Sequence, residues 1–394
     1  MLSRRIPELD GIRGLAILLV VIWHYLSVPL AQSSYPGLHF LGHATILTWS
    51  GVDLFFVLSG FLIGGILIDA RDSATYFSTF YIRRAFRILP LYIVACCAYF
   101  PLSAWVSHAF HGGQLGAMPW ISYATFTQNF WLRNDRWHVF LAQTWSLAIE
   151  EQFYLTLPLL IWFVPAKQLW KVALVGVFAV LAFRSFVYLH FYPQGQTAAY
   201  VLLPCRADGL LLGVLAAIAV RNQAALDFIR AQRHWLYSVA GLLFLALMVC
   251  TIKGWGVMGR VMSTIGYTGL AVFYLALLLF TITSNGILKR VFSWACLRWL
   301  GTIAYGLYLI HVPALDFVFH LFGRRVPTIA RALDLVPLTI ALGASLLLAY
   351  LSWTLFESRL VKIGHRFTYE APPAFRRSPL PSAPGSPSTS PVPY

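Results

Sequence analysis

Residues 11–30 read GIRGLAILLVVIWHYLSVPL, an apolar run broken by two strongly polar side chains, Arg13 and His24. A transmembrane helix needs roughly 20 mainly apolar residues, so this run is long enough to cross a bilayer. Nine more such runs follow, and the ten approximate centres are Val20, Leu58, Ala95, Leu155, Val180, Leu212, Leu243, Phe273, Leu309 and Leu347. The sequence therefore predicts an all-α, polytopic membrane protein of about ten transmembrane helices.

The composition of the whole chain agrees with this fold class. Of the 394 residues, 59% are hydrophobic and 11% are charged, and the mean hydropathy is +0.71. A soluble protein carries about 25% charged residues, so this chain has too few charges to cover soluble domains. A cytosolic enzyme, a coiled coil and a disordered scaffold are thereby excluded.

The net charge of +15 has two readings, a nucleic-acid surface or a topological bias. The basic residues are scattered between apolar runs rather than gathered in one domain. With the N-terminus inside, 19 Lys and Arg lie in cytoplasmic segments and 7 on the opposite face. Cytoplasmic loops are enriched in Lys and Arg, so we expect both termini in the cytoplasm and no nucleic-acid partner.

The C-terminal stretch differs in composition from the rest. It is rich in Pro and Ser, and we expect a membrane domain over residues 1–366 and a disordered cytoplasmic tail over 367–394. The five cysteines stand in apolar runs without a CxxC or CxxH pattern. We therefore expect buried thiols and no metal site.

Several ionisable residues lie inside the expected helices, where charge is expensive and marks a functional site by default. Counting 1.5 Å of rise per residue places eight of them at one depth in the outer half of the membrane. They are His24, Asp53, Glu150, Glu151, Arg184, Arg206, Asp208 and His311. One interpretation is structural ion pairs between helices, and the other, which we favour, is a polar cavity enclosed by the helices.

Arg13 and His24 are the most specific pair in this set. They are eleven residues apart, which is about 1100° of helical rotation, so both side chains lie on one face about 16 Å apart. A neutral histidine can act as a general base at physiological pH. Asp53 or Glu150 could orient it, whereas Glu150 and Glu151 point about 100° apart, so at most one of them reaches His24.

A basic cluster, Arg83, Arg84 and Arg87, precedes the third expected helix. Guanidinium groups pair bidentately with phosphate, so the cluster suits a phosphorylated ligand. An ordinary positive anchor on the cytoplasmic side explains it equally well.

Six blocks in order resemble the bacterial integral-membrane acyltransferase-3 family. They are ELDGIRG (8–14), GVDLFFVLSGFLI (51–63), FYIRRAFRILP (80–90), TWSLAIEEQFY (144–154), RADG (206–209) and LGTIAYGLYLIHVP (300–313). The resemblance implies transfer of an acyl group, commonly acetyl from acetyl-CoA, to a hydroxyl of a carbohydrate or other acceptor. It also implies a multi-pass protein of the bacterial inner membrane, with lipid, acyl-CoA and the acceptor as partners.

The resemblance also implies roles for individual residues. Arg13 and His24 match the pair regarded as essential in the family, and Arg84-x-x-Arg87 matches its basic motif. Ala304 departs from the pattern, because many relatives have Ser there, and we assign it no role. Catalytic roles are thus expected for His24, Arg13, Asp53 and Glu150, and donor binding for Arg84, Arg87 and Arg83.

The expected mechanism brings acyl-CoA from the cytoplasm and the acceptor from outside, with His24 removing the proton of the acceptor hydroxyl. An acyl-histidine intermediate is the variant. Two other function classes stay open. A proton-coupled exporter of a small metabolite would use a similar layer of carboxylates and histidine, and a non-catalytic scaffold would need no such layer.

Overall fold

The computed structural model describes residues 6–111, 118–132, 141–252, 256–323 and 326–370, and every regular element in these ranges is helical. The all-α prediction is confirmed. The α-helices are α1 (Pro7–Ile22), α2 (Val28–Ala31), α3 (Pro36–Ala44), α4 (Gly51–Asp69), α5 (Tyr76–His111), α6 (Trp120–Ala124), α7 (Trp145–Phe163), α8 (Leu169–His190), α9 (Gly195–Val201), α10 (Leu203–Ala219), α11 (Gln223–Ala231), α12 (Arg233–Ile252), α13 (Tyr267–Thr283), α14 (Ile287–Phe292), α15 (Ala295–Leu321), α16 (Leu335–Ser352) and α17 (Ser358–Gly364).

Within the described residues, eight helical segments are long and apolar enough to cross a membrane. They are Pro7–Ala31, Pro36–Asp69, Leu169–His190, Gly195–Ala219, Arg233–Cys250, Met262–Thr283, Ala295–Leu321 and Ala332–Gly364. The other two expected spans fall on α5 and α7. Three successive polar residues, Glu150, Glu151 and Gln152, lower the hydropathy of α7. Some side chains of α5 lie outside the described set. The count of ten stays a prediction.

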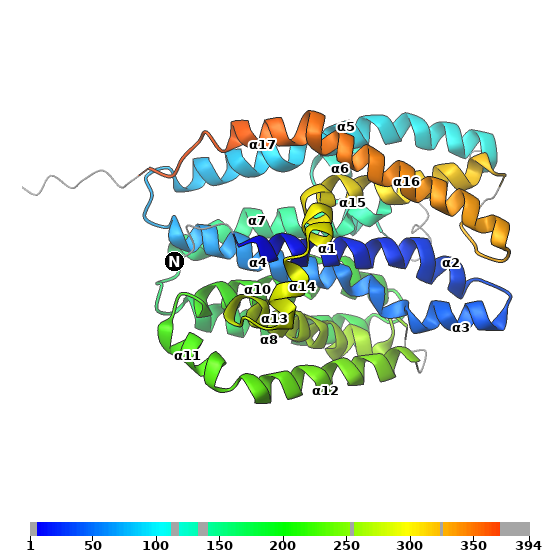
Figure 1. Ribbon diagram of the computed structural model, residues 1–394. Coiled ribbons are helices and arrows are strands. Elements are labelled where there is room, and N and C mark those ends of the chain that lie inside the picture. Colours follow the sequence, from blue (N-terminus) through cyan, green and yellow to red (C-terminus); the bar gives the residue numbers. More distant parts are fainter. Residues whose placement is uncertain (1–5, 112–117, 133–140, 253–255, 324–325, 371–394) are drawn as a thin grey trace, which may run out of the picture.

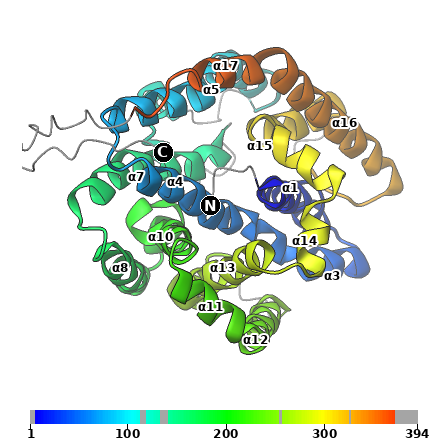
Figure 2. The same ribbon diagram turned by 60° about the vertical axis from the view of Figure 1, so that its left-hand side comes forward.

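The long helices lie roughly parallel to one another, as expected of a membrane bundle (Figure 1). In Figure 2, α1 and α4 run through the middle, with α5, α16 and α17 on one side and α8, α10, α12 and α13 on the other. The start of α1 and helix α17 lie at the same end of the bundle (Figure 1). This arrangement is compatible with both termini on one side of the membrane, and which side that is stays a prediction.

Glycines set the closest helix contacts. A Cβ atom on Gly301 of α15 would lie 1.8 Å from the carbonyl oxygen of Asp10 in α1. A Cβ atom on Gly60 of α4 would lie 1.9 Å from the carbonyl oxygen of Leu210 in α10. Small residues let membrane helices pack backbone to backbone, because association in lipid depends on close van der Waals contact. These contacts fix the register of α15 on α1 and of α10 on α4.

The C-terminal end continues past the membrane region expected from the sequence. The main-chain oxygen of Thr368 accepts hydrogen bonds from Thr75 and Thr79, each at 3.1 Å, and the main-chain N–H of Glu370 donates to Thr75 at 3.0 Å. Residues 367–370, which the sequence assigned to the tail, therefore lie against α5. Residues 371–394 of the expected disordered tail lie outside the described residues.

Candidate active site

A cavity of about 370 Å³ lies between α1, α4, α5, α7 and α15. It brings together four of the expected site residues, Arg13, Arg84, Arg87 and Glu150. The rest of its lining is Phe55, Phe56, Leu58, Ser59, Leu62, Ile63, Ile66, Ile88, Ser146, Leu147, Tyr154, Ala304, Tyr305, Tyr308 and His365. Arg13 stands near the start of α1 and Ile66 near the end of α4, so the cavity lies toward the end of the bundle at which α1 begins.

The charges around the cavity are unbalanced. Arg13 donates to its neighbour Asp10 at 2.9 Å, and the two form an ion pair one helical turn apart. Arg84 and Arg87 form no hydrogen bond or ion pair with any described residue, and the Arg84 guanidinium lies 5.8 Å from the centre of the Tyr154 ring. Glu150 is the one carboxylate among the described lining residues. The cavity therefore suits an anion.

Only one of the two adjacent glutamates faces this space. Glu150 lines the cavity, whereas Glu151 does not. The Oε1 atom of Glu151 is buried and has no hydrogen-bond partner among the described residues. Adjacent helical residues point about 100° apart, which accounts for the difference.

Arg83 does not line the cavity. Its Nε donates to the carbonyl oxygen of Phe367 at 2.7 Å, and its guanidinium lies 5.1 Å from the centre of the Tyr369 ring. Arg83 thus holds the C-terminal segment against α5, and it is not among the cavity-lining residues. Sequence proximity to Arg84 predicted a shared role, but adjacent helical residues such as Arg83 and Arg84 point about 100° apart.

His24 lies beyond the cavity, in a π-helical turn, Trp23–Ser27, that follows α1. Its Nδ1 is 2.9 Å from the carbonyl oxygen of Val20 and 3.3 Å from Nε2 of His311 on α15. Single π-turns inside α-helices often occur at functional sites. The structure pairs His24 with His311, whereas the sequence expected Asp53 or Glu150 beside it.

Tyr308 connects the cavity with the two histidines. Its ring lines the cavity, and its hydroxyl is 2.7 Å from the Ser146 hydroxyl and donates to the carbonyl oxygen of Gln143. The carbonyl oxygen of Tyr308 lies 2.9 Å from Nδ1 of His311. The sequence assigned no role to Tyr308, although the spacing of Tyr308 and His311 places them one turn apart on α15.

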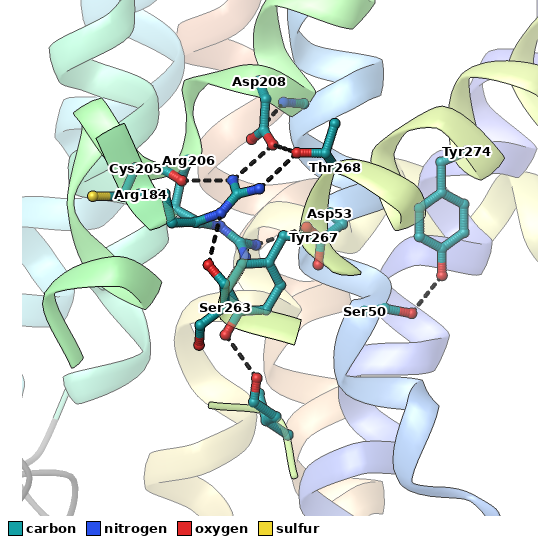
Figure 3. A network of polar contacts seen from close by, with 12 residues as sticks. Ser50, Asp53, Arg184, Cys205, Arg206, Asp208, Ser263, Tyr267, Thr268 and Tyr274 are labelled. Atoms are coloured by element: carbon teal, nitrogen blue, oxygen red, sulfur yellow. Dashed lines mark hydrogen bonds and ion pairs between the residues drawn. The ribbon is translucent and has the colours of Figure 1, made fainter. Parts of the chain in front are cut away.

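The remaining charges form a second, enclosed group between α4, α8, α10 and α13 (Figure 3). Arg206 donates to Asp53 at 2.7 Å and stacks 4.1 Å from the centre of the Tyr267 ring. Arg184 donates to Asp208 at 2.7 Å. The Arg184 side chain is 0% exposed, and that of Asp208 is 3% exposed.

This arrangement corrects the expectation of one polar layer. The eight residues fall into separate groups, namely the Arg–Asp network, the histidine pair and the glutamates of α7. Depth along a helix can be counted from the sequence, but the direction in which each helix faces depends on its packing partners. Asp53 consequently contacts Arg206 rather than His24.

His365, just after α17, stands at the edge of the cavity and lies outside the spanning segments. Burial lowers its pKa, and the positive charges of Arg83, Arg87 and Arg84 lower it further. Burial is thus the main cause of the lowered pKa, and the positive charge around this end of the cavity is the second. Among the described residues, no group of three or more His, Cys, Asp or Glu is placed to hold a metal ion.

Comparisons with known proteins place these features in a family. A family model described as an acyltransferase domain, acyltransferase-3, matches residues 6–355. The putative peptidoglycan O-acetyltransferase YrhL of Bacillus subtilis (strain 168) is 28% identical over 79% of this chain and 49% of its own length. The peptidoglycan O-acetyltransferase OatA of Listeria monocytogenes is 26% identical over 91% of this chain and 56% of its own length.

A putative O-acetyltransferase of Staphylococcus aureus (strain COL) is 25% identical over 92% of this chain and 58% of its own length. The chain thus spans about half the length of the curated relatives it matches. No solved structure gives a significant match.

Proposed function

Because the chain belongs to the acyltransferase-3 family, we propose that it is a membrane-embedded O-acyltransferase. It moves an acyl group, in our proposal acetyl, from acyl-CoA to a hydroxyl of a carbohydrate. The names of its relatives make peptidoglycan the first acceptor to test. The site of action is the bacterial inner membrane. The observation that carries the proposal is the cavity lined by Arg84 and Arg87, neither of which forms a hydrogen bond or an ion pair with a described residue.

The cavity suits the donor in charge and position. Coenzyme A carries several phosphate charges, and guanidinium groups bind phosphate through paired, charge-assisted hydrogen bonds. Arg84 and Arg87 are available for this contact because neither forms a hydrogen bond or an ion pair with a described residue, and both line the cavity. Arg13 adds a third positive charge on the helix that also carries His24. The acyl end of the donor would reach along this helix toward His24, past the Tyr308 ring.

His24 is the proposed general base. The acceptor hydroxyl gives its proton to the imidazole while its oxygen forms a bond to the thioester carbonyl carbon. The carbon–sulfur bond then breaks, and the leaving thiolate takes the proton from the imidazolium. An ester and free coenzyme A result, and the imidazole returns to its neutral form.

The test is His24→Ala in purified, reconstituted protein, with acetyl-CoA as donor and peptidoglycan fragments as acceptor. General-base catalysis is worth roughly 10²–10⁴-fold, so the turnover should fall by about that factor. His190→Ala is the matched control, because this exposed histidine ends α8 and is not among the cavity-lining residues. Full transfer activity in well-folded His24→Ala protein would overturn the proposed mechanism.

A further inference from the structure

The contact between His24 and His311 is a consequence of how α1 and α15 pack. A Cβ atom on Gly14 would lie 1.9 Å from the Leu297 carbonyl oxygen, and a Cβ atom on Gly301 would lie 3.1 Å from the Gly14 nitrogen. The helices run in the same direction, because later residues of α1 meet later residues of α15. His24 is ten residues beyond Gly14, and His311 is ten residues beyond Gly301. Equal rise along parallel helices brings the two imidazoles to the same level.

His311 has a defined protonation pattern. Its Nδ1 lies 3.0 Å from the carbonyl oxygen of Leu307 and 2.9 Å from that of Tyr308. Carbonyl oxygens only accept hydrogen bonds, so Nδ1 carries the proton and donates it. A neutral ring then leaves a lone pair on Nε2, which points at Nδ1 of His24 from 3.3 Å.

The same reasoning assigns the proton on His24. Its Nδ1 faces two acceptors, the Val20 carbonyl oxygen at 2.9 Å and the lone pair of His311. Nδ1 of His24 therefore donates, and its Nε2 carries the lone pair. The ring planes meet at 72°, an angle compatible with this hydrogen bond, because the acceptor lone pair lies in the plane of the His311 ring.

We propose that His311 is the positioning residue of His24: its Nε2 accepts a hydrogen bond from the Nδ1–H of His24, so that Nε2 of His24 is the atom that takes the proton of the acceptor hydroxyl. The inference rests on the proposed function, since it assumes that His24 is the base. Its chemistry parallels the general rule that a catalytic histidine is held in one tautomer by a partner on its other nitrogen. His311 is 0% exposed and is held by two carbonyl groups, so the partner itself is rigid.

Two substitutions separate this role from packing. His311→Gln keeps an oxygen that can accept the hydrogen bond, and His311→Leu fills the space with apolar atoms only. We expect His311→Leu to lower kcat on the order of 10-fold, as part of the contribution of the general base, with the donor KM unchanged. His311→Gln should retain more activity than His311→Leu. The proposal would be overturned if the His311→Leu variant retained as much activity as the His311→Gln variant, or more.

A second measurement does not depend on activity. Nuclear magnetic resonance of protein with isotopically labelled histidine nitrogens identifies which nitrogen of each ring is protonated, and the spectrum of His24→Ala assigns the His24 signals. We expect the proton on Nδ1 of His24 in the unsubstituted protein. A proton on Nε2 instead would overturn the inference even if the His311 variants fail to fold.

The two proposals can fail separately. Full activity of His24→Ala would end the proposed role of the base and this inference with it. Inactive His24→Ala together with unchanged kcat in His311→Leu would leave the base in place and remove only the role of His311.

Discussion

Two arginine clusters lie within this bundle, and they differ in what surrounds them. Arg184 is fully buried and donates to the carboxylate of Asp208, to three carbonyl groups and to Thr268. Arg84 and Arg87 line a cavity and bond to no described residue. Charge in an apolar environment is costly unless it is paired. The matched cluster, Arg184 with Asp208, therefore fits a structural role, and the unmatched cluster, Arg84 with Arg87, fits the phosphate-binding role proposed above. The partners of a charge, rather than its depth, distinguish the two roles.

Removing one partner of the matched cluster should cause the largest loss of thermal stability. In Asp208→Leu, Arg184 loses its carboxylate in a buried site, and removal of one partner of a buried pair costs about 3–5 kcal/mol. We expect a large fall in the thermal unfolding temperature of the detergent-purified protein. The double variant with Arg184→Met should recover part of that stability, because no unpaired charge remains.

An unchanged unfolding temperature in Asp208→Leu would contradict the structural assignment. The same outcome would remove the contrast between the two clusters, since Arg184 would then tolerate the loss of its partner as Arg84 tolerates having none.

Removing the unmatched cluster should weaken binding of the acyl donor without changing the stability of the protein. In Arg84→Ala with Arg87→Ala, no hydrogen bond or ion pair with a described residue is lost and only the Arg84 contact with the Tyr154 ring disappears, so the unfolding temperature should stay near that of the unsubstituted protein. Each lost charge-assisted contact with a donor phosphate is worth at least about 1.4 kcal/mol, or roughly 10-fold in affinity. The donor KM should rise accordingly, measured with acetyl-CoA in reconstituted membranes.

Arg359→Ala is the matched control for this pair, because it removes an exposed positive charge on α17, outside the cavity lining. An unchanged donor KM in the double variant would make Arg84 and Arg87 a topological anchor only.

The sequence predicts the helical class well because it depends on the length of apolar runs, which bilayer thickness sets. It also identifies Arg13, Arg84, Arg87 and Glu150, which the structure brings to one cavity. It does not predict that Asp53 turns toward Arg206, because this depends on the rotation of α4 against α10. The spacing of polar residues along one helix does not tell which other helix that face will pack against.

The sequence predicted the contact between His24 and His311 only in part. The sequence places His24 and His311 at one depth without pairing them. The spacing of Gly14 and Gly301 could have predicted the pairing, because each glycine precedes its histidine by ten residues. Recognising it requires knowing that α1 and α15 touch, and only the three-dimensional packing supplies that fact.

The smallest expected effect is on the pH dependence of stability at His365. Its measurement tests whether positive charge surrounds this residue when no donor is bound. Burial and the nearby Arg83, Arg87 and Arg84 lower its pKa below the ordinary 6.5. Below pH 6.5 the unfolded chain binds a proton that the folded protein does not, so stability falls as the pH drops toward the lowered pKa. His365 is only partly buried and much of its side chain reaches solvent, so solvent screens the repulsion and the effect is small.

His365→Gln should therefore lose less thermal stability than the unsubstituted protein between pH 6.5 and the lowered pKa, as measured by unfolding in detergent. Saturating coenzyme A should shrink this difference, because bound phosphates offset the arginine charges that disfavour protonated His365. An identical pH dependence of the two proteins would show that the arginines exert no net repulsion here. Because burial also lowers the pKa of His365, a difference that coenzyme A leaves unchanged would assign the shift to burial and would withdraw this support for phosphate binding at the arginines, while the structural role of the matched cluster would stand.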